Sequence, residues 1–424
     1  MWAFLLALPT TAAAGPYLIP VNVGFGELYA FRVLVLVGFP VVLLAAPRLG
    51  WVPRVVAAPL LFTGLLWVAW GLASLSWTPD PKAGAVELTT ILIGASAAGC
   101  IILIVGTSRE RFRIVALGWA AAFSLVAVTA AWELLSGQHL QSQFVEAMAA
   151  RDAGAFVTAT FGNPNALGAF LLMTEALFLL QLFSGGSWRK RVPWAMGLGL
   201  VPILMALGGC RTALIGTVVC VGIFGWTLCT WRQRVWFLLG GTALSVVALW
   251  TIMRITGLDL AAIAATWQLG GELQYGGSAG LRLNLLRNGI GMMLGTAGCG
   301  VGAGGFVYAI EHGYGVFDTG GIVNPHNYWL EIGSQYGLLV LLAVVMVLLW
   351  WAILLLRDLS HARKHRDRRG RVLVASGLAG LAAYTIAAGS NSTFIPQPTN
   401  WVFLGTLAAL VATSASRTAN VEEC

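Results

Sequence analysis

The chain has 424 residues, of which 58% are hydrophobic and only 10% are charged. Soluble globular proteins carry roughly 25% charged residues. This composition therefore excludes a soluble domain and predicts an all-α protein that crosses a membrane many times. The formal net charge of +8 is concentrated in loops predicted to lie on one side of the membrane, so it does not indicate binding of nucleic acid.

Twelve apolar segments are expected to cross the membrane, each close to the ~20 residues that a bilayer requires. The first is the least regular, because Pro9, Gly15, Pro16 and Pro20 interrupt it. It also lacks the basic residues that precede the apolar run of a signal peptide. The expected spans are residues 2–20, 27–46, 55–77, 84–105, 112–136, 164–184, 192–208, 211–230, 235–255, 335–356, 371–390 and 399–416.

The basic residues predict the orientation of these spans, since loops on the cytoplasmic side are enriched in Lys and Arg. With the N-terminus placed inside, the inner loops and the tail contain 18 of the 25 basic residues. Both termini are therefore expected in the cytoplasm. The residues concerned are Arg48, Arg54, Arg109, Arg111, Arg113, Arg189, Lys190, Arg191, Arg232, Arg234, Arg357, Arg363, Lys364, Arg366, Arg368, Arg369, Arg371 and Arg417.

One long outer connection, about residues 256–334, is the only plausible inserted domain. It divides the chain into 1–255 with nine spans, the loop 256–334, and 335–424 with three spans and a cytoplasmic tail. Short helical patterns run through Asp259–Trp267 and Gly280–Leu294. The glycine-rich segment Gly298–Phe306 lacks the preceding strand and following Lys-Ser/Thr of a phosphate loop, so a flexible turn is favoured.

Arg211 lies in the segment Gly208–Leu214, at the predicted outer turn between the seventh and eighth spans. An arginine is costly to desolvate there, and its planar guanidinium suits phosphate. The helix that begins at Thr212 would add an N-terminus that favours anions. The alternative is an arginine that reaches the lipid headgroups without any ligand.

His326 is the candidate proton acceptor, because histidine exchanges a proton near neutral pH. It lies between the rigid Pro325 and Asn327, and an interfacial Tyr-Trp pair follows. Glu331 could orient its ring. The competing histidines either fall in the basic inner loop or have few ionisable neighbours in sequence; they are His139, His312, His361 and His365. The alternative is a purely structural histidine.

Other polar residues near the outer ends of the spans are candidate accessory groups. Arg282 and Arg287 are five residues apart and face different sides of a helix, so one could face the site while the other is solvated. Asn163 and Asn165 could bind sugar hydroxyls or cap a helix after the turn. Arg151 and Arg254 also fall on the outer side. The six cysteines show no paired spacing, so neither a disulfide framework nor a metal site is expected.

Together these segments resemble the O-antigen ligase family. The residues that carry the resemblance are Asn163-Pro164-Asn165, Gly208–Ala213, Ser278–Arg282, Gly298–Phe306 and Pro325-His326-Asn327, followed by Gly333 and Gly337. The twelve-span layout with one large outer loop also looks like that family.

The resemblance implies a glycosyltransferase of the GT-C membrane fold that works without a metal or other cofactor. Family members move a glycan from undecaprenyl diphosphate to lipid A–core at the periplasmic face of the bacterial inner membrane. By the same resemblance, Arg211 and Arg282 would bind the donor diphosphate and His326 would be the catalytic histidine. Two departures are that Cys210 replaces the family's usual serine and that no acidic residue falls within Asn391–Asn400.

Three alternatives stay open. An O-antigen polymerase or a glycan-to-protein ligase would use the same donor with a different acceptor. A lipid-linked sugar flippase or transporter would need ionisable residues near the midplane of the membrane. Glu87 and Glu175 are candidates for that role, and Arg32 could pair with one of them. The sequence shows no internal repeat, however, which argues against a transporter.

Overall fold

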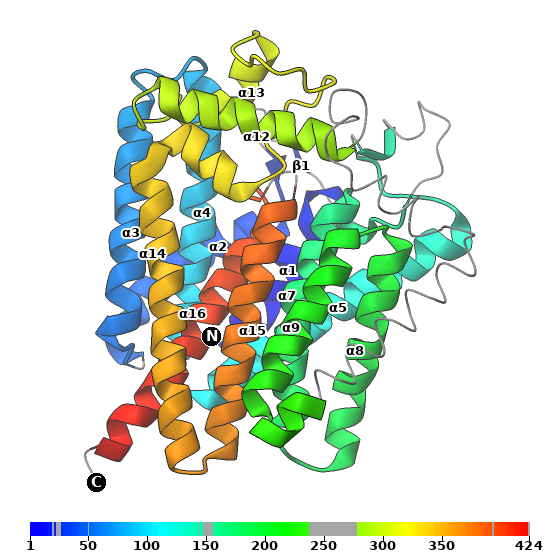
Figure 1. Ribbon diagram of the computed structural model, residues 1–424, viewed down its shortest axis with the longest axis vertical. Coiled ribbons are helices and arrows are strands. Elements are labelled where there is room, and N and C mark those ends of the chain that lie inside the picture. Colours follow the sequence, from blue (N-terminus) through cyan, green and yellow to red (C-terminus); the bar gives the residue numbers. More distant parts are fainter. Residues whose placement is uncertain are drawn as a thin grey trace.

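The computed structural model describes residues 1–18, 21–22, 27–49, 51–142, 144–146, 156–236, 278–391 and 394–422. In this part of the chain, long helices run along the longest dimension of the molecule, and α12 and α13 lie across one end of the bundle (Figure 1). Nine of the described helices are long and apolar enough to cross a membrane. The prediction of a helical, multi-pass membrane protein is thus confirmed.

Almost all of the regular structure is helical. One antiparallel pair of short strands, β1 (Val21–Asn22) and β2 (Glu27–Leu28), follows the first helix and aligns Val21 with Leu28. The helices are α1 (Trp2–Leu18), α2 (Ala30–Ala45), η1 (Ala46–Arg48), α3 (Arg54–Ser74), α4 (Pro81–Val105), α5 (Arg109–Ser136), η2 (Ala159–Phe161), α7 (Pro164–Phe183), α8 (Trp188–Leu207), α9 (Arg211–Leu228), α12 (Ser278–Gly295), α13 (Gly305–Glu311), α14 (Tyr328–Lys364), α15 (Arg368–Ser390) and α16 (Pro398–Glu422).

The nine candidate spans correspond to nine of the twelve expected from the sequence: α2 with η1, α3, α4, α5, α7, α8, α9, α14 and α15. Two further expected spans form α1 and α16, which are helical and pack on α5 and α4 but are not among the nine. The expected span 235–255 and the helix Asp259–Trp267 lie outside the described residues, except for 235–236. The helix expected over Gly280–Leu294 is present as α12.

Several helices begin where a short polar side chain accepts a hydrogen bond from the first turn, as expected for N-caps. Asp80 accepts from the Ala83 N–H before α4, and Asp367 accepts from the Gly370 N–H before α15. Such caps satisfy backbone donors that the helix itself leaves unpaired. The starting points of these helices are therefore a local property of the sequence.

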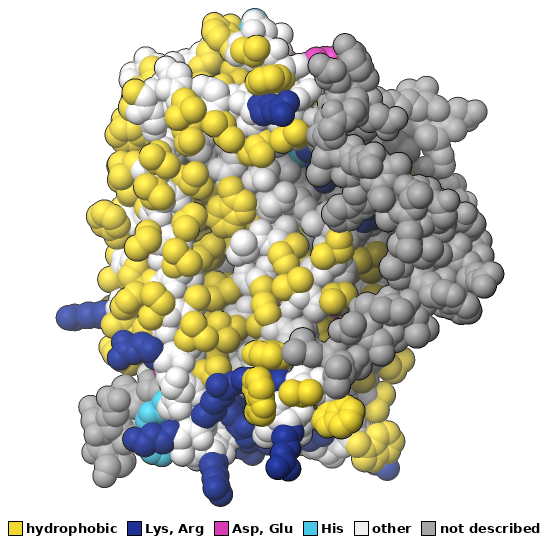
Figure 2. Space-filling model, in the orientation of Figure 1, with side chains coloured by type: hydrophobic (Ala, Val, Ile, Leu, Met, Phe, Trp, Pro, Cys, Tyr) yellow, Lys and Arg dark blue, Asp and Glu magenta, His cyan; other side chains and the backbone are white. Residues whose placement is uncertain are grey.

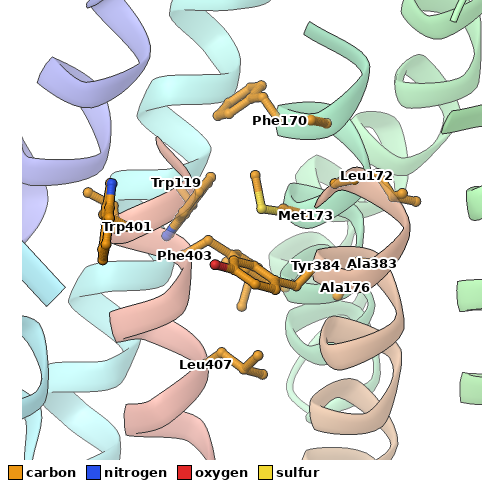
Figure 3. Close-up of a cluster of buried hydrophobic side chains, with 14 of the residues drawn as sticks. Trp119, Phe170, Leu172, Met173, Ala176, Ala383, Tyr384, Trp401, Phe403 and Leu407 are labelled. Atoms are coloured by element: carbon orange, nitrogen blue, oxygen red, sulfur yellow. The ribbon is translucent and has the colours of Figure 1, made fainter. Parts of the chain in front are cut away.

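Aromatic side chains from four helices form the centre of the bundle (Figure 3). Trp119 of α5 packs on Phe170 of α7 and on Phe403 of α16, with ring centroids 5.6 Å apart in both pairs. Tyr384 of α15 stacks on the far side of Phe403. The most hydrophobic window of α7 is 83% buried, so this helix is surrounded by protein on all sides. The core fixes how α5, α7, α15 and α16 sit relative to one another.

The two ends of the bundle differ in charge. Lys and Arg side chains gather at the lower end of the visible face, away from α12 and α13 (Figure 2). The C-terminus lies at that lower end, whereas the N-terminus lies part-way along the bundle (Figure 1). The basic loops predicted to share one side of the membrane thus lie at one end of the bundle (Figure 2), and which side of the membrane that end faces stays a prediction. We call the lower end the inner end and the end covered by α12 and α13 the outer end.

Helix α14 begins at Tyr328, inside the segment expected to be a loop, and it is sharply kinked at Gly337 (φ 80°, ψ −178°). The glycine-rich segment packs into this kink: the Val301 and Gly302 N–H groups donate to the carbonyls of Ser334 and Gln335, at 2.8 and 3.0 Å. The segment forms turns, as predicted, but it is bound to the helix rather than free. Because these two amides are already paired, they do not form an anion cradle.

Candidate active site at the outer end

His326 immediately precedes α14 and is held by its neighbours on both sides. Pro325 is buried, and the Asn327 side chain caps α14 by accepting from the Trp329 and Leu330 N–H groups at 3.0 and 3.2 Å. His326 itself has a φ of 52°, a conformation that non-glycine residues rarely adopt and that recurs at functional sites. Its Nδ1 atom is buried without a hydrogen-bond partner. Burial of Nδ1 leaves Nε2 as the candidate nitrogen for contact with a substrate.

Arg282 provides the positive charge beside His326. It lies on α12, which packs against α14, and its side chain is partly buried. Burial lowers the pKa of the Arg282 guanidinium from its usual value. Burial, and secondarily the Arg282 charge, lower the pKa of His326 to about 4. The imidazole is therefore neutral at neutral pH. In the described part of the chain, no acidic side chain forms an ion pair with Arg282.

The segment that leads to His326 is fastened to α12 by two amides that the sequence analysis did not single out. Asn288 pairs with Phe317 in both directions, donating to its carbonyl at 2.8 Å and accepting from its N–H at 2.9 Å. Asn284 donates to the Asp318 carbonyl at 2.8 Å. These two asparagines are four residues apart on one helix face. This spacing was the feature of the sequence that could have indicated a shared role. The two side chains hold the loop next to Arg282.

Glu331 is part of a buried network at the start of α14, and its proposed orienting role towards His326 stays a prediction. Its carboxylate lies near the backbone N–H groups of Phe394 and Ile395, and it is close enough to Glu87 of α4 for the two carboxyl groups to interact electrostatically. Glu87 accepts hydrogen bonds from the Tyr336 hydroxyl at 2.5 Å and from Gln335 at 3.2 Å. From the sequence, Glu331 was expected to orient His326, and Glu87 was a candidate for ion transport. The structure places both where α4 meets the first turns of α14.

Arg211 is exposed at the first turn of α9, directly after a tight turn at Gly209 (φ 66°). The Cys210 thiol donates to the Pro164 carbonyl at 2.7 Å and touches Gly168, so the outer ends of α7 and α9 are joined. Burial raises the pKa of this thiol to about 12. It stays protonated and can therefore donate the hydrogen bond that a serine hydroxyl would donate at this position.

Among the described residues, Arg211 makes no hydrogen bond or ion pair with His326 or Arg282. Both sites nevertheless border the outer half of α15. A Cβ at Gly216 of α9 would touch Ile386 of α15, and Tyr328 packs on Tyr384 of the same helix. Arg211 and His326 thus occupy the same end of the bundle on either side of one helix.

The loop beside Arg211 is held by Glu133 of α5, which the sequence analysis missed. Its carboxylate accepts from the N–H groups of Thr158 and Ala159 at 2.9 and 2.8 Å, and it contacts His139 Nδ1 at 3.0 Å. His139, which has few ionisable neighbours in sequence, thus contacts one acidic side chain, that of Glu133. The adjacent Val157 N–H donates to the Leu207 carbonyl at 3.4 Å. Glu133 thus holds the segment Val157–Ala159, which borders the turn before Arg211.

The remaining predicted site residues take up different positions. Asn163 caps α7 by accepting from the Asn165 N–H at 2.8 Å, so the capping alternative is supported for this residue. Arg287 is exposed and lies over the ring of Phe317 at 5.3 Å. Arg151 and Arg254 lie outside the described residues.

Glu175, the second candidate for ion transport, and Arg32, the suggested partner of one of the two acids, each have a hydrogen-bond partner. Glu175 accepts a hydrogen bond from Thr217 at 2.9 Å, and Arg32 donates to Thr90 at 3.4 Å. Across the described ranges, no three His, Cys, Asp or Glu side chains are grouped as a metal site.

Comparison with known proteins places these features in a recognised domain. Residues 194–345 match the sequence profile described as O-antigen ligase. The matched stretch runs from α8 into α14, and it includes Arg211, Arg282 and His326. The chain is also similar to the teichuronic acid biosynthesis protein TuaE of Bacillus subtilis (strain 168). The two are 23% identical over 400 residues, which cover 92% of this chain and 80% of the relative.

Proposed function

Because the chain belongs, through its residues 194–345, to the O-antigen ligase family, we propose that it is a glycosyltransferase of the GT-C type. It transfers a glycan from undecaprenyl diphosphate to lipid A–core, with inversion at the anomeric carbon and without a metal ion. The reaction takes place at the outer end of the bundle, on the periplasmic face of the bacterial inner membrane. The observation that carries this proposal is a His326 whose pKa is lowered by burial and by Arg282, beside an arginine that has no acidic partner among the described residues.

In the proposed reaction, the acceptor hydroxyl attacks the anomeric carbon of the donor sugar. Its proton passes to Nε2 of His326 as the new glycosidic bond forms. The bond from the anomeric carbon to the diphosphate oxygen breaks, and the diphosphate leaves with that electron pair. A positioned general base contributes roughly 10²–10⁴ in rate.

The arginines supply the complementary charge. Arg282 binds the donor diphosphate close to His326, and Arg211 binds it from the α9 side, where the helix N-terminus also favours an anion. Guanidinium groups directed at a departing diphosphate stabilise the charge that develops on it. Arg287, Arg151 and Arg254 stay accessory candidates.

Donor binding also prepares the base. The positive charge of Arg282 is one of the two causes that lower the pKa of His326. A bound diphosphate offsets this charge, so the pKa of His326 rises towards the usual histidine value once the donor is in place. The histidine then accepts a proton more readily in the donor complex than in the free enzyme.

The test is transfer by purified protein in detergent with EDTA, using an undecaprenyl-diphosphate-linked glycan and lipid A–core. We expect modified lipid A–core with the wild type and none with His326→Ala. The matched control is His312→Ala, because His312 is exposed and, among the described residues, its side chain contacts the Tyr308 carbonyl and ring of its own helical turn. Equal activity of the His326→Ala variant and the wild type would overturn the assignment.

The same assay separates the alternatives. A lengthened donor with unmodified core indicates a polymerase, and glycan on an added protein acceptor indicates a glycan-to-protein ligase. The name of the similar Bacillus subtilis protein refers to teichuronic acid biosynthesis, so a glycan acceptor other than lipid A–core is the specific second candidate. No transfer to any of these acceptors would favour the flippase.

A further inference from the structure

A cavity of about 220 Å³ lies at the inner end of the bundle, at the opposite end from His326. It is formed where α5 and α15 begin and α7 ends, and α16 closes one side. Three arginines line it: Arg109 and Arg113 from α5, and Arg369 from α15. Figure 2 shows that Lys and Arg side chains gather at this end of the molecule.

Arg109 and Arg369 lie in the first turns of α5 and α15, where the backbone dipole repels positive charge, and Arg113 lies one turn further along α5. Arg109 and Arg113 are four residues apart, so they share one face of α5. Among the described residues none of the three has a recorded hydrogen bond or ion pair. The neighbouring Arg111 is different, because it donates to the Ile104 carbonyl at 2.8 Å. The cavity arginines thus keep their donors available despite an unfavourable backbone field.

The other lining groups leave the arginines as the principal donors. The hydroxyls of Ser184 and Thr413 donate to carbonyls of their own helices. Gln181 contributes an amide, and Phe112 and Leu373 form an apolar wall. The cavity therefore combines concentrated positive charge with a hydrophobic side.

We propose that this cavity binds a phosphate group, either the headgroup phosphate of an anionic phospholipid or free inorganic phosphate. Three guanidinium groups can surround such an anion, each with paired N–H donors. The volume is below the ~300–1,000 Å³ of pockets that hold drug-sized ligands, so it suits a phosphate rather than an oligosaccharide. Basic pockets between helices on the cytoplasmic side are typical sites for acidic headgroups.

The experiment compares three proteins purified in zwitterionic detergent. They are the wild type, the cavity variant Arg109→Gln/Arg113→Gln/Arg369→Gln, and a control variant that removes the same charge elsewhere at the inner end. The control is Arg189→Gln/Arg232→Gln/Arg357→Gln, whose side chains are exposed and do not line the cavity. Native mass spectrometry measures binding of phosphatidylglycerol and phosphatidylcholine, and thermal unfolding measures the response to inorganic phosphate.

We expect the wild type and the control to retain phosphatidylglycerol in preference to phosphatidylcholine, and the cavity variant to bind it at least about tenfold more weakly. Stabilisation by inorganic phosphate that is lost only in the cavity variant, without any lipid preference, supports the site and identifies the free ion as its ligand. Equal losses of binding in the cavity and control variants would overturn the proposal. It would also be overturned if the cavity variant lost neither lipid binding nor stabilisation by phosphate. If the triple variant does not fold, Arg369→Gln is compared with Arg357→Gln by the same criteria.

Discussion

The kink in α14 at Gly337 gives a sharp test of how the active site is positioned, through the variant Gly337→Ala. The backbone there has φ 80° and ψ −178°, a region that only glycine adopts readily, at a cost of about 1–3 kcal/mol for other residues. An added Cβ would also lie 2.2 Å from the Gly298 carbonyl oxygen. That atom belongs to the backbone and cannot rotate away, so overpacking adds about 1–3 kcal/mol.

The combined cost is on the order of 2–6 kcal/mol, a large part of a typical folding free energy of 5–15 kcal/mol. The helix can relieve this strain only by straightening, which alanine favours. Straightening would swing Tyr328–Tyr336 away from the glycine-rich segment and displace His326. A displacement of about 1 Å at a reacting group can cost ~10²-fold in rate.

Two measurements check this reasoning: thermal unfolding followed by tryptophan fluorescence, and glycan transfer to lipid A–core. Gly337→Ala should lower both the unfolding temperature and the transfer rate. The controls are Gly64→Ala in α3 and Gly389→Ala in α15, where an added Cβ meets nothing within 4 Å. These should match or slightly exceed the wild type in stability. Wild-type stability and activity in Gly337→Ala would refute the steric argument.

Three further outcomes are expected. In Arg282→Gln, the pH below which kcat/KM falls should rise from its value near 4, because removal of the positive charge raises the pKa of His326. This pH should stay below the usual pKa of histidine, because His326 remains buried. An unchanged pH dependence would contradict the proposed effect of the Arg282 charge on the pKa of His326. Cys210→Ser should retain transfer because the hydroxyl can replace the thiol donor to Pro164, whereas Cys210→Val should lose stability; equal behaviour of the two would exclude a role for that hydrogen bond. Asn327→Ala should destabilise the protein by about 1 kcal/mol through loss of the cap on α14, and denaturant unfolding of the two proteins measures the difference.

Much of the fold was predictable because its determinants are local. Nine of the expected spans correspond to apolar helices of sufficient length, and α12 lies where the pattern from Gly280 predicted it. The capping alternative for Asn163 followed from its place before Pro164. The start of α14 was placed too late because Asn327 was assigned as a possible accessory residue of the site and not as the cap of this helix.

The candidate site was predictable only as a set of residues, and its arrangement was not. Sequence spacing named His326 and Arg282 separately, but their proximity depends on α12 packing across α14. It also suggested that Glu331 orients the histidine, which stays a prediction, and packing places that carboxylate near Glu87 in a different helix. The anchoring role of Glu133 was missed because its partners follow about 25 residues later.

The sequence by itself determined that this chain is a helical membrane protein, where most of its helices begin, and which end of the bundle is basic. Those properties depend on apolar length, on caps and on loop charge, each of which acts over a few residues. The tertiary structure alone decided that Arg282 lies beside His326, that Cys210 joins α9 to α7, and that three arginines from two helices line one cavity at the inner end. Such contacts join residues far apart in the chain, and they arise from the packing of whole helices, which no local pattern specifies.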